Sequence, residues 1–377
     1  MSIWYTSSYM NQVQIGALPA QKIIQMIDSG FIKNANKEHV SPASLDLTLT
    51  SEIYEIKGLI LPKVGETIQS LLSLMEATSV SLDEPVKCNH LYLAKLNESL
   101  ELPKQVYGYC NPKSSTGRLD VHVRVLADGV PRYDSLTPAG FKGDLWVAIA
   151  PKSFAIKLSD GVPLTQLRLF NGDSRFSELD LEVAMKNGLI WHPTEDRKLG
   201  YEELVTNDLD GTVVLTALVE EGMCGYECIA SPEQVVDVTK VGGYEAKDFF
   251  KPIKIQAGAL RLEKNKFYIL SGAERVCIPP SLASEMVPMD ERSGDFRSHY
   301  AGFLDPGWGT GGEGKGRPFT LEVRPFEDLV VRPGQPIAKI KFERMLAEPD
   351  FHYDTKQSNY LTQKGPKLGK HFKQNKE

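Results

Sequence analysis

The chain has 377 residues and a mass of 41.9 kDa, a length that predicts two domains rather than one small module. Hydrophobic residues make up 41% of the chain and charged residues 24%, which excludes a disordered or fibrous protein. The formal net charge of −6 argues against an electrostatic grip on nucleic acid along the whole chain. No apolar run approaches the roughly 20 residues that span a membrane, and the first residues lack the features of a signal peptide. We therefore expect a cytoplasmic protein with no membrane or nucleic-acid partner.

Two segments have the spacing of short helices. Ile23, Ile24 and Ile27 lie on one helical face, and Gly30 ends this segment. A weaker helical pattern covers residues 178–187. Most other segments alternate between apolar and polar residues, which is typical of strands; examples are residues 45–49, 121–125 and 337–342. The sequence therefore predicts an all-β protein with a few short helices.

An internal repeat divides the chain. HLYLAKLNESLELP (90–103) aligns without gaps with KFYILSGAERVCIP (266–279), which places Tyr92 on Tyr268 and Glu98 on Glu274. In each copy a basic, serine-containing block follows, KSSTGR (113–118) and RSGDFR (292–297). Two similar blocks in the same order predict two divergent β domains in tandem.

The predicted boundaries follow from this repeat and from the polar, turn-rich stretch that begins at residue 171. We expect a first repeat over residues 1–175, a linker with a short helix over 176–206, a second repeat over 207–345, and a C-terminal segment over 346–377.

The two basic blocks are candidate phosphate sites. Each places two cations five residues apart around hydroxyl groups and a glycine, and such groups can together bind a phosphate. A polar turn with solvated arginines is the alternative for either block alone. The occurrence of such a basic block in both repeats favours the phosphate site.

Glu322 is the candidate catalytic carboxylate. In the predicted strand FTLEVR (319–324), Leu321 and Val323 share the apolar face, and Glu322 and Arg324 share the other. A solvated surface pair is the alternative interpretation. The corresponding strand of the first repeat has Ala148 opposite Glu322, so only one repeat carries this carboxylate.

Two common nucleotide chemistries are excluded by motif. The glycine-rich GTGGEGKGRP (309–318) is not a P-loop, because no Gly-Lys-Ser/Thr opens a helix there. The zinc nucleoside-deaminase pattern, His-x-Glu followed by Pro-Cys-x-x-Cys, is also absent. Any hydrolysis of a nucleotide base by this protein is therefore expected to proceed without zinc.

Several motifs in order resemble the dCTP deaminases of the trimeric dUTPase-like superfamily, in their long tandem form. They are SPASLDLTLT (41–50), the KSSTGR block, LDPGW (304–308) with TLEV (320–323), RPGQPIAKIKFE (332–343) and NYLTQKGP (359–366). The resemblance implies two distorted β-barrels and conversion of dCTP to dUTP and ammonia without zinc. It also implies Mg²⁺ bound through the substrate triphosphate, and a homo-oligomer that is a trimer or a multiple of three.

The resemblance also implies roles for individual residues. Glu322 would be the general base and proton shuttle for the water that attacks C4 of cytosine. The residues that would orient this water or lie beside it are Ser114, Arg118, Ser293 and Arg297. Those that would bind substrate are Lys113, Ser115 and Arg292 at the triphosphate, Asp305 at the sugar 3′-hydroxyl, Ala301 in the base pocket, and Tyr353, Tyr360 and Gln363 in a segment that folds over the phosphates.

The sequence departs from the family pattern at Ala148, at Gly294 in place of the second serine, at Lys113 in place of arginine, and at Asn359 in place of lysine. The losses in the two repeats are complementary. A mixed pocket is therefore expected, in which repeat 1 supplies Ser114 and Arg118 and repeat 2 supplies Glu322. A pocket built by repeat 2 alone is the alternative.

Two other functions stay open. The first is dUTP pyrophosphatase activity, alone or added to deamination, and the second is a non-catalytic nucleotide sensor, which Ala148 supports for the first repeat only. Glu322 followed by Val323 favours deamination over the first of these.

Overall fold

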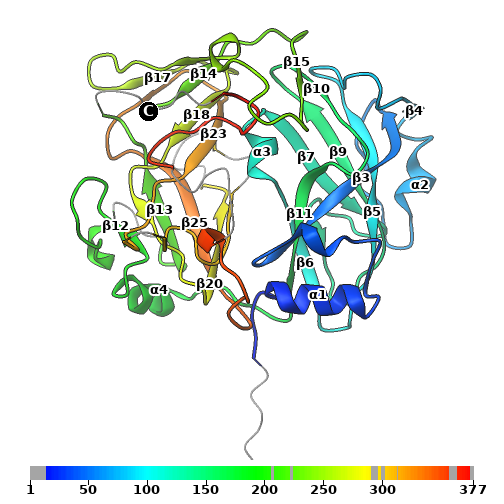
Figure 1. Cartoon of the computed structure of the whole chain (residues 1–377), viewed down its shortest axis with the longest axis horizontal. Coiled ribbons are helices and arrows are strands. Elements are labelled where there is room, and N and C mark those ends of the chain that lie inside the picture. Colours follow the sequence, from blue (N-terminus) through cyan, green and yellow to red (C-terminus); the bar gives the residue numbers. More distant parts are fainter. Residues whose placement is uncertain are drawn as a thin grey trace, which may run out of the picture.

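The computed structural model describes residues 14–204, 208–220, 224–289, 302–311, 313–355 and 363–373, together with the backbone of 296–298. Strands dominate it, which confirms the all-β prediction. Figure 1 shows two β units side by side, the first coloured blue to green and the second green to orange. Among the described residues, no helix is long and apolar enough to cross a membrane.

The first unit is a nearly closed β-barrel. Its strands follow the order β7-β9-β5-β3-β11-β6-β8, and a backbone hydrogen bond of 2.8 Å from Asp134 N to Val125 O joins the two ends of this path. Helix α1 begins after Pro19 and buries Ile23, as the apolar spacing predicts. The elements are α1 (Ala20–Asp28), β1 (Ile32–Lys33), η1 (Lys37–His39), β2 (Val40–Ser41), β3 (Ser44–Glu55), α2 (Ile68–Leu71), β4 (Thr78–Ser79), β5 (Tyr92–Glu101), β6 (Tyr107–Pro112), α3 (Ser114–Gly117), β7 (Val121–Ala127), β8 (Ser135–Leu136), β9 (Lys142–Pro151), β10 (Ala155–Lys157) and β11 (Pro163–Phe170).

The second unit repeats this strand order in two sheets. One sheet has the order β16-β14-β18-β23-β21 and the other β13-β25-β20-β22. The elements are α4 (Glu178–Met185), β12 (Ile190–Trp191), η2 (Tyr201–Glu203), β13 (Thr212–Thr216), β14 (Tyr226–Cys228), β15 (Val235–Asp237), η3 (Ala246–Asp248), β16 (Phe250–Pro252), β17 (Leu260–Leu262), β18 (Tyr268–Ser271), β19 (Arg275–Val276), β20 (Leu282–Val287), β21 (Phe296–Ser298), β22 (Phe303–Leu304), β23 (Thr320–Pro325), β24 (Leu329–Val331), β25 (Pro336–Arg344) and η5 (Tyr353–Thr355).

A buried carboxylate makes the same contact in both units. Glu98 accepts hydrogen bonds from the Thr48 backbone N–H at 2.9 Å and from the Thr48 hydroxyl at 2.8 Å. Glu274 accepts the same pair from Thr216, at 2.8 and 2.6 Å. Burial raises the pKa of both carboxyls, and the threonine hydrogen bonds oppose this rise. The alignment of Glu98 with Glu274 in the sequence therefore corresponds to a real structural repeat.

Residues 176–204 of the predicted linker pack on the second unit. Helix α4 begins with a capping box between Ser177 and Asp180, and its buried residues Leu181 and Met185 lie in the core of the second unit. The segment that the sequence analysis treats as a linker thus contributes to the second hydrophobic core.

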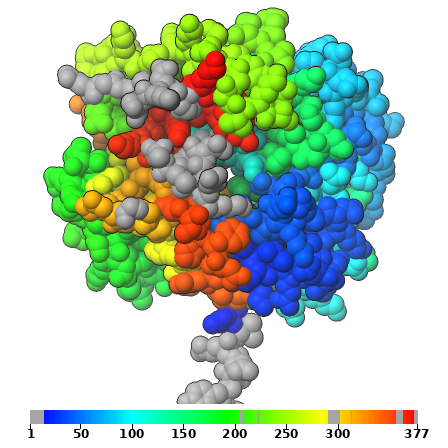
Figure 2. All heavy atoms as spheres, in the orientation of Figure 1, coloured from blue at the N-terminus to red at the C-terminus, as the bar shows by residue number. Residues whose placement is uncertain are grey.

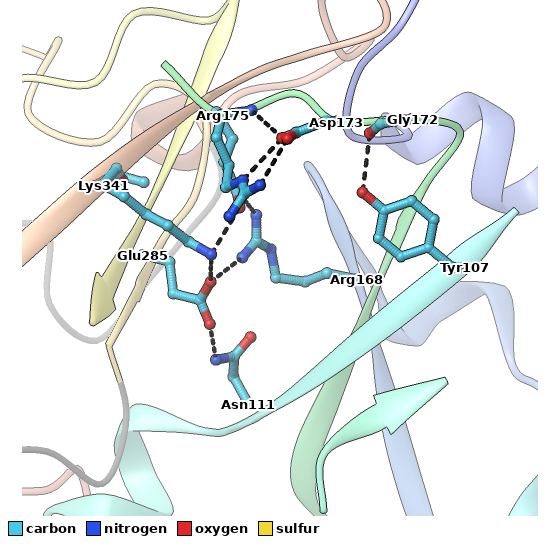
Figure 3. A network of polar contacts seen from close by, with 10 residues as sticks. Tyr107, Asn111, Arg168, Gly172, Asp173, Arg175, Glu285 and Lys341 are labelled. Carbon is cyan, nitrogen blue, oxygen red and sulfur yellow. Dashed lines mark hydrogen bonds and ion pairs between the residues drawn. The ribbon is translucent and has the colours of Figure 1, made fainter. Parts of the chain in front are cut away.

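An ionic network at the junction holds the two units together (Figure 3). Arg168 on β11 is fully buried and pairs with Glu343 and with Glu285, the latter at 3.3 Å. Lys341 also binds Glu285, at 2.8 Å, and the Asn111 amide donates to the same carboxylate at 2.6 Å. Burial alone would raise the pKa of Glu285, but Arg168 and Lys341 beside it hold this pKa below its ordinary value. The junction therefore depends on charges from both units.

Removing the buried cation should destabilise the protein. We expect Arg168→Leu to lower the free energy of unfolding by about 3–5 kcal/mol, because Glu285 and Glu343 would lose their shared guanidinium inside the junction. Arg175→Leu is the matched control, since Arg175 and its partner Asp173 are 65% and 62% exposed, and it should cost less than about 1 kcal/mol. Urea denaturation followed by tryptophan fluorescence measures both values, and equal losses would contradict this account of the junction.

Candidate functional site

The first basic block forms a short helix that faces the second unit. KSSTGR folds into α3, and the Arg118 backbone N–H donates to Ser114 O at 3.1 Å, which holds the two residues one turn apart. The Arg118 Nε lies 3.7 Å from Glu322 Oε1, and the two side chains are only 4% and 1% exposed. A guanidinium of one unit and a carboxylate of the other thus meet in a buried site.

Strand β23 presents Glu322 to the first unit by alternation. Leu321 and Val323 enter the core of the second unit, so Glu322 and Arg324 point the other way. Glu322 pairs with Ile269 across the β-ladder. At the equivalent position of the first unit, Ala148 pairs with Leu93, which aligns with Ile269 in the repeat. The register therefore confirms that Ala148 is the structural counterpart of Glu322.

The face of the first unit that carries Ala148 is covered by its own chain. Residues 56–75 cross this face, and their apolar side chains pack on it to form a separate hydrophobic cluster. The cluster consists of Ile56, Ile68, Leu71, Met75, Leu93, Leu126, Trp146 and Ala148. Of two equivalent faces, one thus receives Arg118 from the neighbouring unit and holds a carboxylate, whereas the other is closed by an apolar cap.

The C-terminal segment returns to the junction between the units. Gln363 accepts a hydrogen bond from Arg118 Nη2 at 3.2 Å and donates one to Pro318 O at 2.9 Å. Further on, Leu368 and Phe372 are buried in the hydrophobic core that the first unit shares with parts of the second. Figure 2 shows this segment, in red, at the surface between the two units. The segment is therefore anchored in the core and also touches the Arg118–Glu322 pair.

A cavity of about 280 Å³ adjoins α3, and Lys113, Ser115, Lys370 and His371 are among its lining residues. Burial lowers the pKa of Lys370, Lys113 lowers it further, and Asp46 opposes this. Lys113 itself is paired with Asp46. Two lysines and a hydroxyl facing one cavity are suited to an anion such as a phosphate.

His371 lines this cavity as a neutral imidazole. Its Nε2 lies 3.2 Å from Val238 O, and because a carbonyl only accepts, this nitrogen carries the proton. Burial, followed by the charge of Lys370, lowers the pKa of His371 to about 4. The ring therefore adds no positive charge near neutral pH.

Asp305 lies at the junction of the two units, in contact with Ala43. The Ala43 backbone N–H donates to Asp305 Oδ1 at 3.3 Å, so the LDPGW motif of the second unit touches the SPASLDL motif of the first. Burial raises the pKa of Asp305 to about 7, and the Ala43 hydrogen bond and Arg168 oppose the rise.

Tyr353 lies against LDPGW at the base of the C-terminal segment. Its ring centroid is 5.0 Å from that of Trp308, and its backbone N–H donates to Pro306 O at 2.9 Å. The adjacent Asp354 pairs with Arg317 of the glycine-rich loop. This arrangement fixes the point from which the segment leaves the second unit.

Several predicted residues lie outside the described residues. These are Arg292, Ser293, Ala301 and Tyr360, and of Arg297 only the backbone is described. Of the eight other predicted residues, Tyr353 packs on Trp308 of the second unit. The other seven lie around the junction and are Lys113, Ser114, Ser115, Arg118, Asp305, Glu322 and Gln363.

The sequence analysis missed two charged residues near the site, Asp120 and Lys370, and noted Arg324 only as a residue on the face of Glu322. Asp120 lies in the turn that follows α3, where no strand alternation could have indicated its direction. Among the described residues, no group of three or more His, Cys, Asp or Glu side chains is gathered as a metal site.

Comparisons with known proteins cover both units. Residues 14–173 match the N-terminal domain of the 2′-deoxycytidine 5′-triphosphate deaminase (DCD) family, and residues 192–372 match its C-terminal domain. The chain is also similar to the crystal structure of 2′-deoxycytidine 5′-triphosphate deaminase from Agrobacterium tumefaciens, with 32% sequence identity and a TM-score of 0.79. That alignment covers 89% of this chain and 100% of the other. A search of curated proteins found no match.

Proposed function

The chain belongs to the 2′-deoxycytidine 5′-triphosphate deaminase family and is a dCTP deaminase, and from this premise we propose that it works without zinc and uses Glu322 as its general base. The observation that carries the proposal is the buried contact between Glu322 and Arg118, which come from different units of one chain. In the reaction, a water oxygen bonds to C4 of cytosine, the C4–N bond breaks, and ammonia leaves as dUTP forms.

Glu322 has the chemistry that this reaction requires. Neutral water is a poor nucleophile toward an aminopyrimidine, so a carboxylate must remove a proton from water and return one to the departing amine. A carboxylate that is 1% exposed acts in a site with little competing water. Arg118 would hold the ionised carboxylate in place, and Ser114, one turn before Arg118, would orient the water.

The triphosphate would occupy the cavity beside α3. Lys113 and Ser115 line it, and we assign Arg292 to the same phosphates. Mg²⁺ would arrive as part of the substrate, bound by the phosphate oxygens. Asp305 would accept the sugar 3′-hydroxyl, Ala301 would line the base pocket, and Tyr353, Tyr360 and Gln363 would belong to the segment over the phosphates.

We propose one mixed site per chain. Ser114 and Arg118 come from the first unit and Glu322 from the second, and the apolar cap over Ala148 leaves no equivalent acid on the first unit. A trimer of two-domain chains remains our proposal for the assembly. Its contacts would have to use surfaces other than the capped face.

One experiment tests the function. Purified protein is incubated with Mg-dCTP, and the nucleotides are separated by anion exchange while ammonia is measured. We expect dUTP and ammonia in equal amounts, before and after dialysis against a zinc chelator. Accumulation of dUMP would indicate an added pyrophosphatase activity, absence of product would indicate a nucleotide sensor, and activity that tracks zinc content would overturn the zinc-free mechanism.

The C-terminal segment should contribute through Gln363. We expect Gln363→Ala to lower kcat/KM for dCTP about tenfold, because Arg118 would lose the amide that links it to the segment. Gln335→Ala, at an exposed turn of the second unit, is the matched control. Deletion of the whole segment would be less informative, because it would also remove the buried Phe372. Unchanged kinetics of the Gln363 variant would separate the segment from catalysis.

A further inference from the structure

A second ion pair lies beside the Arg118–Glu322 pair, with its charges reversed. Arg324, two residues after Glu322 on the same face of β23, binds the carboxylate of Asp120, two residues after Arg118. The Asp120 carboxyl is fully buried, and the Arg324 side chain is 21% exposed. Each segment thus contributes one acid and one base, at matching positions.

The Asp120–Arg324 pair is joined to two other parts of the chain, residues 152–153 and Asn265. The Ser153 hydroxyl donates to Asp120 Oδ2 at 2.5 Å, and Arg324 Nη2 donates to Ser153 Oγ at 3.2 Å. Arg324 also donates to the Asn265 carbonyl. The Lys152 backbone N–H donates to Asp120 O at 3.0 Å. These contacts tie β23 to the end of α3 and to the turn between β9 and β10.

The backbone at Asp120 supports a specific requirement for its carboxylate. Asp120 has φ of 56°, in the left-handed region where glycine is the least strained residue. A carboxylate at this position is therefore retained against a conformational cost. Its Oδ2 accepts the contacts from both Arg324 and Ser153.

We propose that Asp120 and Arg324 are positioning residues for deamination. They fix the register between β23 and α3, so that Glu322 faces Arg118, and they balance the charge around the general base. This inference rests on the proposed role of Glu322. Neither residue is assigned a contact with substrate.

The charge balance gives the proposal a distinctive signature. Residues two apart on a strand are about 7 Å apart. At this distance a unit charge shifts the titration of a neighbour by about 0.5–1 pH unit where the effective dielectric constant is about 35–70. Glu322 faces Arg118 at the end of α3, and Gln363 of the C-terminal segment accepts a hydrogen bond from the same arginine. On β21, the backbone of Arg297 is level with Arg324.

The two partners should shift the acid limb of the pH profile in opposite directions. This limb reports protonation of the general base, which is active only when ionised. Asp120→Asn leaves Arg324 unbalanced, favours the ionised base and should move the limb of kcat/KM down by about 0.5–1 pH unit. Arg324→Gln leaves Asp120 unbalanced and should move it up by a similar amount. The double variant Asp120→Asn/Arg324→Gln should return within about 0.3 pH unit of the original.

The single variants should change kcat much more than KM. We expect each single variant to lower kcat about 10- to 100-fold, as for a misplaced catalytic group, with KM changed less than threefold. Arg324→Lys keeps the charge and should leave the limb in place while lowering kcat, because an ammonium cannot reproduce the forked contacts of a guanidinium. Asp120→Gly, which suits the left-handed backbone, should reproduce the Asp120→Asn shift even if the asparagine variant folds poorly.

Arg124→Gln is the matched control, because Arg124 binds a partly buried aspartate, Asp134, in the first unit and lies level with Ala148 instead of Glu322. It should leave the limb unchanged. Shifts of Asp120→Asn and Arg324→Gln in the same direction, or losses of activity in both of these variants with a fixed limb, would overturn the positioning role. If Glu322→Gln retains turnover, the proposed function itself fails, whichever way the Asp120 and Arg324 variants behave.

Discussion

Replacing Glu322 by glutamine should reduce deamination of dCTP by at least about 10³-fold while nucleotide binding is retained. The substitution removes the group that takes and returns protons and keeps its size, and general acid–base catalysis contributes typically 10²–10⁴-fold. Ammonia release under saturating Mg-dCTP measures the loss, and isothermal titration with dCTP measures binding.

Glu327→Gln is the matched control, because Glu327 is exposed shortly after the same strand. It should retain normal turnover. The fold is expected to survive, because the glutamine at position 322 still offers a polar side chain to the buried Arg118. The thermal melting curve of the Glu322 variant checks this. Near-normal turnover by a folded Glu322→Gln protein would remove Glu322 from the mechanism.

A pair of serine variants decides which unit orients the attacking water. Ser114 begins α3, one turn before the arginine that contacts Glu322. We expect Ser114→Ala to lower kcat about 100-fold, and Ser293→Ala to lower it less than about threefold. Both are assayed side by side for ammonia release, with dCTP affinity measured on each.

The reverse outcome, a severe Ser293→Ala defect with a mild Ser114→Ala defect, would show that the second unit builds its pocket alone. Equal and severe defects would require both serines near one substrate. The contact between Arg118 and Glu322 favours the mixed pocket, because the basic block that reaches the carboxylate is that of the first unit.

Much of this outcome was accessible from the residues alone. Period-two alternation predicts the strands that contain Leu45, Val121 and Ile340, and all three lie in strands, because alternation directly reports which face of a sheet is buried. The ungapped alignment of Glu98 with Glu274 predicts the tandem repeat. Alternation also placed Glu322 away from the apolar face of its own strand.

The sequence could not place what lies opposite that face. Along the chain, strands β7 to β11 of the first unit and the second unit up to β23 separate Arg118 from Glu322. Only the docking of the two units brings them to 3.7 Å. The pairing of Asp120 with Arg324 and the network around Arg168 depend on the same docking. Such contacts are set by complementary surfaces, which no local pattern encodes.

The fate of Ala148 illustrates the same division. The sequence by itself determined that the first unit lacks the acid, because one aligned position holds alanine instead of glutamate. Only the tertiary structure decided what replaces it: Ile68, Leu71 and Met75 cover the equivalent face. Without a charge to hydrate, that face is more stable buried under apolar side chains than exposed to water.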